Sequence, residues 1–221
     1  MICLLCGRYQ AQNLSLLALL TGRDEPASLC LACEQRFVSL VNEHVCRGCG
    51  RLFQGDDLCG DCVRWSDPLL MNRALFQYND AFKEFMQRYK FEGDYRLRAV
   101  FSACFGEFVQ EQGADVIVPI PVSEHTDLTR GFNQVLGLLG DVAYTSLLAV
   151  QAFDKQQQSH GDRKMRMTKA NPFVLETIPD LTDKTVLLVD DVYTTGRTLY
   201  HARALIATLN PKNIKSVTLA R

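Results

Sequence analysis

The stretch from Thr185 to Leu199 constrains the fold of this chain more than any other part of its sequence. It begins with an unbroken apolar run, Val186 to Val189, which is typical of a strand buried on both faces of a parallel sheet. Two acids and a threonine-rich turn follow, and apolar residues then recur at the spacing of one helix face. These helical positions are Leu199, Ala202, Leu205, Ile206 and Leu209. The order of strand, polar loop and helix predicts an α/β fold.

The turn contains the residue types that bind a phosphate. Where a parallel strand leads into a helix, the helix N-terminus presents free backbone N–H groups and the positive end of its dipole. Gly196 lets the backbone approach a phosphate closely. Three hydroxyl groups add further donors, from Thr194, Thr195 and Thr198. The turn is therefore a candidate phosphate site.

The acids before the turn extend this candidate site. Asp190 and Asp191 would repel a phosphate, so we expect them to face the hydroxyls of a sugar or a magnesium ion. A ligand with a phosphate at one end and a diol nearby is a ribose 5-phosphate. Many α/β proteins contain a strand that ends in acids before a threonine N-cap, but an acidic pair directly before Thr-Thr-Gly-x-Thr favours the ligand site.

The segment from Val189 to Thr198 resembles the phosphoribosyl pyrophosphate (PRPP) loop of type I phosphoribosyltransferases. This resemblance implies a parallel sheet flanked by helices. It also implies that Asp190 and Asp191 contact the ribose hydroxyls and that magnesium accompanies PRPP. The residues that would hold the 5-phosphate are Thr194, Thr195, Gly196, Arg197 and Thr198.

Eight of the nine cysteines form Cys-x-x-Cys pairs near the start of the chain. The pairs are Cys3/Cys6, Cys30/Cys33, Cys46/Cys49 and Cys59/Cys62. In a reducing compartment this density indicates metal binding rather than disulfides, and two pairs complete a tetrahedral four-thiolate zinc site. We therefore expect two structural zinc ions. A glycine directly follows the first pair and the third pair. This repeat favours one zinc site from the first two pairs and another from the last two, with a cross-braced arrangement as the alternative.

Two further residues could add to these sites. His44 lies between the cysteine pairs, but four thiolates already complete each site, so we interpret it as a surface residue. Cys104 stands alone among apolar neighbours and is predicted to be a buried core thiol.

The length of 221 residues fits one domain preceded by a small module. We predict a double zinc-ribbon-like module over residues 1–65 and a phosphoribosyltransferase-like domain over residues 66–221. The module is expected to fold only with metal bound. Cys46→Ser is therefore predicted to unfold the module and to leave the loop from Asp190 to Thr198 formed.

Net charge and hydropathy limit the partners of the chain. The net charge of −1 excludes a global basic field, so any nucleic-acid surface must be a local patch. The apolar stretch from Leu14 to Leu20 is too short to cross a bilayer, and no basic leader precedes it. We expect a cytoplasmic protein without membrane insertion.

The middle of the chain supplies the remaining predicted elements. Strands are expected at Ala74–Tyr78, Asp115–Pro121 and Ile214–Leu219, and two helices between the first two strands carry aromatic residues that we assign to the core. The inward positions are Phe82, Phe85, Met86 and Tyr89 on one helix and Leu97, Val100 or Phe101, Cys104, Phe105 and Phe108 on the other. A polar loop that ends in Arg130-Gly131 is a candidate pyrophosphate grip.

Gln156 to Lys169 is polar and basic, with cations at Arg163, Lys164, Arg166 and Lys169. This composition is typical of a mobile lid over an anionic ligand. It is equally typical of a solvated surface loop, so both interpretations stay open.

Taken together, the motifs resemble those of the ComF family over essentially the whole chain. They are the paired Cys-x-x-Cys motifs, Tyr-Lys-Phe-x-Gly-Asp with Lys90, Val-Pro-Ile-Pro, Arg-Gly-Phe-Asn-Gln and the PRPP loop. The resemblance implies a role in natural transformation, in which the protein handles incoming single-stranded DNA on the cytoplasmic side beside the helicase-like ATPase ComFA. It also adds Lys90, Arg130 and Gly131 to the PRPP-binding residues.

The sequence departs from the ComF pattern in the basic segment, where Gly161 and Lys169 replace a leucine and an asparagine. No segment after Leu219 could form a base-recognising hood. Two functions therefore stay open. The first is DNA uptake with a site for PRPP or another phosphorylated ribose, and the second is a genuine transferase that joins PRPP to a base.

Overall fold

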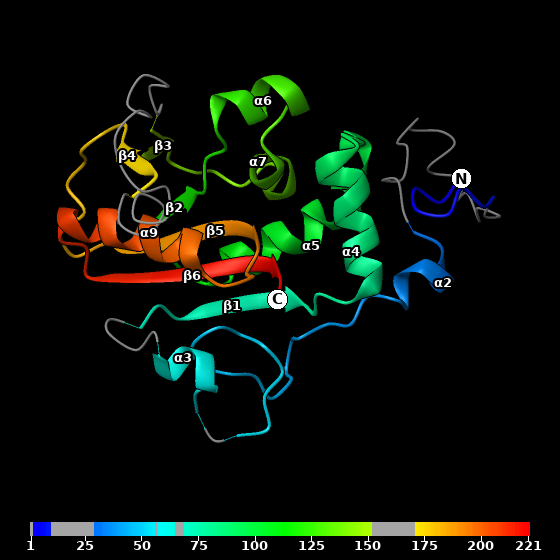
Figure 1. Cartoon of the computed structure of the whole chain (residues 1–221), viewed down its shortest axis with the longest axis horizontal. Helices are drawn as coiled ribbons and strands as arrows, with labels where there is room; N and C mark the ends of the chain where they lie inside the picture. The colour runs from blue at the N-terminus through cyan, green and yellow to red at the C-terminus, as the bar shows by residue number, and fades with distance from the viewer. Residues whose placement is uncertain (1, 10–28, 56, 65–68, 152–170) are drawn as a thin grey trace, which may run out of the picture.

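The computed structural model describes residues 2–9, 29–55, 57–64, 69–151 and 171–221. Its centre is a four-stranded parallel sheet with the order β1-β6-β5-β2 (Figure 1). The strands are β1 (Asn72–Phe76), β2 (Val116–Pro119), β5 (Thr185–Val192) and β6 (Asn213–Ala220). Helices flank this sheet, so the predicted α/β fold is confirmed.

Strand β5 is buried on both faces, as its apolar run predicts. Leu187 and Val189 belong to one hydrophobic cluster, and Val186 and Leu188 belong to the other. This alternation follows from the two-residue period of a strand. The strand continues to Val192, so both acids of the candidate site lie within it and not in the loop that follows.

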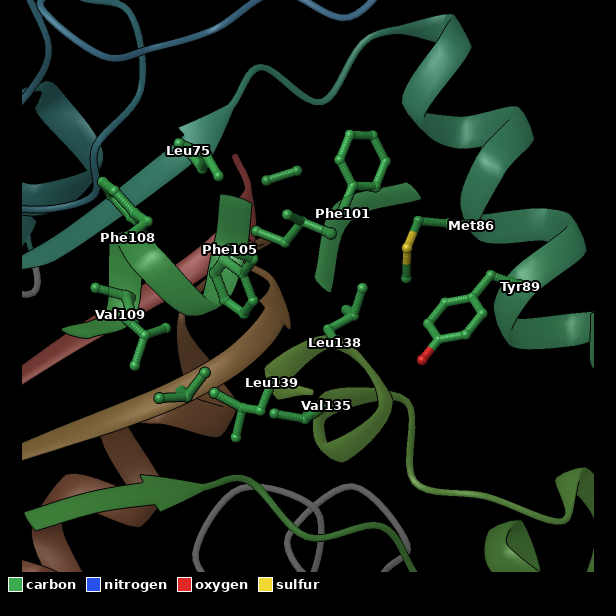
Figure 2. Packing of buried hydrophobic residues seen from close by; sticks show 14 of the residues in the cluster. Leu75, Met86, Tyr89, Phe101, Phe105, Phe108, Val109, Val135, Leu138 and Leu139 are labelled. Carbon is green, nitrogen blue, oxygen red and sulfur yellow. The ribbon is translucent and has the colours of Figure 1, made fainter. Parts of the chain in front are cut away.

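The first face of the sheet is covered by helices whose apolar residues form an aromatic core (Figure 2). They are α4 (Asp80–Met86), the π-helical turn η1 (Gln87–Phe91), the 3-10 turn η2 (Tyr95–Leu97), α5 (Arg98–Gln110) and α7 (Gln134–Leu139). The assignment of the aromatic residues to the core is confirmed, because Phe82, Phe85 and Phe105 are fully buried.

Cys104 does not belong to this core, which corrects the sequence prediction. Phe101, Phe105 and Phe108 turn inward from α5 at the spacing of one helix face. Cys104 lies at the edge of that face, where its side chain is exposed and its Sγ donates a hydrogen bond to the Phe101 carbonyl (3.3 Å).

The second face is covered by α9 (Arg197–Ile206), by the turn η4 (Ala207–Leu209) that follows it, and by a small antiparallel pair. The pair consists of β3 (Leu148–Val150) and β4 (Phe173–Leu175), which the sequence did not predict. A short helix, α6 (Glu124–Arg130), also replaces the loop expected there, because Ser123 caps its first turn by accepting a hydrogen bond from the Thr126 N–H (3.2 Å).

The cysteine-rich segments contain two short helices, α2 (Leu31–Glu34) and α3 (Gly60–Arg64). In Figure 1 the first segment lies beside α4 and the second lies under β1. The predicted boundary between residues 65 and 66 falls outside the described residues and stays a prediction. Among the helices that the structure describes, none is long and apolar enough to cross a bilayer.

Candidate functional site

The eight paired cysteines form two groups in the order of the sequence, as the repeat favours. The groups are Cys3, Cys6, Cys30 and Cys33, and Cys46, Cys49, Cys59 and Cys62, and the sulfur atoms of each group lie within 4.8 Å of one another. The cross-braced alternative is therefore wrong. The Cys6 and Cys30 sulfurs are 3.6 Å apart, and those of Cys49 and Cys59 are 3.8 Å apart. A tetrahedral ion with Zn–S bonds of about 2.3 Å would separate its sulfurs by roughly 3.8 Å, so the geometry fits zinc.

The two groups share one backbone pattern, which is the structural counterpart of the sequence repeat. Cys3 N–H donates to the Arg8 carbonyl (3.0 Å), and Cys46 N–H donates to the Arg51 carbonyl (2.8 Å). In each group a backbone N–H also donates to the first sulfur, from Cys30 to Cys3 Sγ (3.3 Å) and from Cys59 to Cys46 Sγ (3.2 Å). Burial by itself raises the pKa of Cys3, but backbone donors outweigh it and lower that pKa to about 6. Such donors favour the thiolate form that a metal requires.

His44 is exposed, and its Nδ1 contacts the Phe53 carbonyl, as expected of a surface residue.

The first cysteine group contacts the π-helical turn. The Arg88 guanidinium donates to the carbonyls of Leu5 (2.7 Å) and Leu4 (3.1 Å), which lie between Cys3 and Cys6. Arg88 therefore joins this group to η1, which also carries Lys90.

The predicted phosphate turn leads from β5 into α9. Gly196 has φ 78°, a left-handed conformation that favours glycine, and a Cβ atom there would overlap the buried hydroxyl of Tyr193. Gly196 has no side chain to cap α9, and the Arg197 N–H donates to Thr195 Oγ1 (3.4 Å), so the N–H groups that follow in the first helical turn can donate to an anion. The side chains of the turn are exposed beside them. They are Thr194, Thr195, Arg197 and Thr198.

The two acids are buried at the carboxyl end of β5, and Lys90 reaches one of them. Lys90 Nζ lies 2.7 Å from Asp191 Oδ2, and the Asp191 side chain is only 4% exposed. The Asp191 N–H donates to Asp190 Oδ1 (2.8 Å). Burial, followed by the charge of Asp191, raises the pKa of Asp190 well above its ordinary value. The pair therefore resists carrying two negative charges.

An open cleft of ≈ 410 Å³ brings two further predicted residues together. Lys90 and Arg130 both line it, with Phe91, Glu92, Gly93 and Thr129. Gly131 ends α6 in a left-handed conformation (φ 80°), and Arg130 donates to the side-chain oxygen of Gln134. Because Gln134 is neutral, this contact does not neutralise the positive charge of Arg130. Lys90 lines the cleft and contacts the acidic pair, so it connects the two parts of the site.

The basic segment with Arg163, Lys164, Arg166 and Lys169 lies outside the described residues, as do Gly161 and the rest of the predicted lid.

Comparison with known proteins agrees with this arrangement. A model of the phosphoribosyl transferase domain matches residues 109–221, which contain the phosphate turn and Arg130. The competence protein ComFC of Streptococcus pneumoniae (strain ATCC BAA-255 / R6) is 34% identical over the full length of both chains. ComFC of Bacillus subtilis (strain 168) is 30% identical over the whole of this chain and 95% of its own. The chain belongs to the ComFC family of competence proteins.

The similarity to ComFC proteins spans the whole chain, so it covers both cysteine groups as well as the phosphoribosyl transferase domain. The sequence did not reveal three residues that connect these parts. They are Arg88, Asn72 and Arg221. For Asn72 a signal exists in hindsight, because it is a polar residue at the start of a strand whose last three residues are apolar. Arg88 and Arg221 carry no local signal.

Proposed function

We propose that this ComFC-family protein acts in natural transformation, where it handles incoming single-stranded DNA on the cytoplasmic side. Two full-length relatives named as competence proteins support this role. We also propose that it works beside an ATPase of the ComFA type, because the ComF resemblance implies that partner.

We propose further that the phosphate turn and the acidic pair bind PRPP or another phosphorylated ribose, with magnesium bound through the ligand. One observation carries this proposal: a buried acidic pair and a helix N-terminus whose N-cap residue is glycine follow one another at the carboxyl end of β5. The turn would take the 5-phosphate, and Asp190 and Asp191 would accept hydrogen bonds from the ribose hydroxyls.

Single-stranded DNA would bind through local cations, since the net charge of the chain is −1. We propose Arg130 with the cations of the basic segment, Arg163, Lys164, Arg166 and Lys169. Replacement of these four segment cations by serine should weaken binding and flatten its dependence on salt, because fewer counterions are released. Unchanged binding in that variant would move the DNA site to another surface.

We propose zinc as the metal of both cysteine groups. Four thiolates in a closed tetrahedral arrangement are typical of structural zinc, and the sulfur separations agree with it.

The second candidate function is a transferase that joins PRPP to a base. The cleft favours it, because Lys90 and Arg130 there could hold a leaving pyrophosphate. In that function, release of pyrophosphate would depend on an added base and on the acidic pair.

One double variant separates these functions. Asp190→Asn with Asp191→Asn should abolish PRPP binding in calorimetry with magnesium, and it should leave single-stranded DNA binding equal or tighter. The transformation frequency of cells that carry the double variant should fall if transformation requires PRPP binding at this site. A normal transformation frequency would show that transformation does not require it. Pyrophosphate release by the wild type with some base, lost in the variant, would establish the transferase instead.

A further inference from the structure

The second cysteine group and the phosphate turn share one hydrophobic cluster. Cys46, Cys49, Cys59 and Cys62 pack in the same cluster as Tyr193 and Leu199, which flank the phosphate turn. Tyr193 is buried at the start of the turn, and its hydroxyl lies where a side chain on Gly196 would be. The packing of Tyr193 therefore bears directly on the conformation of the turn.

Arg221 connects the turn to the cysteine group. Its Nη1 donates to the carbonyls of Tyr193 (3.0 Å) and Thr194 (2.8 Å), and its guanidinium lies 4.8 Å from the centre of the Tyr193 ring. The guanidinium also faces the Cys49 side chain, and its Nε is buried with no hydrogen-bond partner among the described residues.

Asn72 forms a second connection between the cysteine group and the sheet. Its backbone N–H donates to the Gly48 carbonyl (2.8 Å), and its Nδ2 donates to the Cys49 carbonyl (3.3 Å) and to Thr218 Oγ1 (3.2 Å). Thr218 is the neighbour of Asp190 in the register of β5 and β6. Because Asn72 is buried, these hydrogen bonds fix the loop between Cys46 and Cys49 against the sheet.

We propose that the metal-loaded group of Cys46, Cys49, Cys59 and Cys62 holds the phosphate turn in its binding conformation, with Arg221 as the positioning residue. This inference rests on the proposed function of the turn as a PRPP site. Four thiolates and one divalent ion carry a net charge of about −2, which anchors the Arg221 guanidinium. Loss of the ion would release Arg221, and the Tyr193 and Thr194 carbonyls would lose their donor.

The coupling is testable without any ligand, by hydrogen exchange of the intact protein before and after metal removal with a chelator. The amides of Tyr193 to Leu199 should exchange at least about 10-fold faster without metal, whereas those of α7, in the other cluster, should change little. Unchanged exchange in the turn would overturn the proposal.

A variant that keeps its metal tests the role of Arg221 itself. Arg221→Lys retains the positive charge but replaces the planar guanidinium, whose Nη1 donates to both carbonyls, with a compact ammonium on a shorter side chain. Its metal content should equal that of the wild type, and its affinity for PRPP should fall about 10-fold. Arg47→Ala is the matched control. Arg47 belongs to the same Cys-x-x-Cys motif, but its side chain is 63% exposed and pairs with Asp57.

Linkage provides a readout that a general loss of stability would not produce. If the two sites are coupled, saturating PRPP must raise the metal affinity, measured by equilibrium competition with a chromogenic chelator, in the wild type and in Arg47→Ala, but not in Arg221→Lys. PRPP that binds without raising the metal affinity would overturn the coupling and leave the proposed function intact. If the wild type binds no PRPP, the proposed function fails, and the hydrogen-exchange comparison still decides the coupling.

Discussion

At the scale of single residues, Asp190 is the group whose chemistry the fold changes most clearly. Burial and the neighbouring Asp191 raise the pKa of Asp190 above the ordinary value of 3.8. Between that value and the raised one, the folded protein binds a proton that the unfolded chain has lost. The stability that this proton provides is present below pH 3.8 and is lost as the pH rises through the raised pKa.

Asp190→Asn should therefore stabilise the protein relative to the wild type as the pH rises, because asparagine has no proton to lose. We expect the difference in melting temperature between variant and wild type to become more positive from pH 4 to pH 8. The same variant should bind PRPP at least about 10-fold more weakly, since it loses a carboxylate acceptor for ribose. A difference in melting temperature that does not change with pH would contradict the assigned pKa direction.

Lys90 balances the charge of Asp191, and its removal would leave that carboxylate buried without a cation. Lys90→Met should lower the free energy of unfolding by about 2 kcal/mol, less than for a fully buried pair because the Lys90 side chain is 26% exposed. Urea denaturation measures this loss. Lys90→Arg keeps the charge and is expected to recover most of it, whereas equal losses in both variants would rule out a charge effect.

At the scale of elements, the phosphate turn depends on one backbone conformation. Gly196→Ala adds a Cβ that strains a left-handed residue and overlaps the Tyr193 hydroxyl. We expect a loss of about 1–3 kcal/mol in the free energy of unfolding and at least a 10-fold loss of PRPP affinity.

Gly113→Ala is the control for the strain alone, because Gly113 has φ 60° and no atom within 4 Å of an added Cβ. It should cost about 1 kcal/mol and leave PRPP affinity unchanged. Equal PRPP affinities in the two variants would show that the conformation at Gly196 does not determine binding.

At the scale of the whole molecule, the two cysteine groups contact opposite parts of the site. Arg88 holds the first group on the turn that carries Lys90, and Asn72 and Arg221 hold the second on the sheet and the phosphate turn. If the cysteine-rich module and the sheet were independent, Cys46→Ser would unfold the module and leave the loop from Asp190 to Thr198 formed. Because the second group contacts the phosphate turn, we instead expect Cys46→Ser to increase hydrogen exchange in that loop as well.

Elemental analysis should find close to two zinc ions per chain. Chelation should lower the melting temperature of the single unfolding transition by at least about 5 °C, because metal binding contributes to folding. A folded protein that contains no zinc as purified, before any chelator is added, would contradict the zinc assignment. Two separate transitions, of which only one responds to the chelator, would instead support independent parts.

Features that depend on neighbours along the chain could be predicted from the sequence. An unbroken apolar run predicted β5, helical spacing predicted α9, and the spacing of the cysteine pairs predicted two four-thiolate groups. The acidic pair and Gly196 were visible for the same reason. Local spacing did not show that Ser123 caps a helix before Arg130, nor which edge of α5 carries Cys104.

Contacts between distant side chains could not be predicted in this way, because they depend on the tertiary fold. Lys90 and Asp191 are 101 residues apart, and Asn72 and Thr218 are 146 apart. Periodicity places a side chain on one face of its own strand or helix, but its partners depend on strand order and on how the helices cross the sheet. For that reason the sequence predicted the components of the candidate phosphate site, and the fold alone packed the second cysteine group in one cluster with Tyr193 and Leu199, which flank its turn.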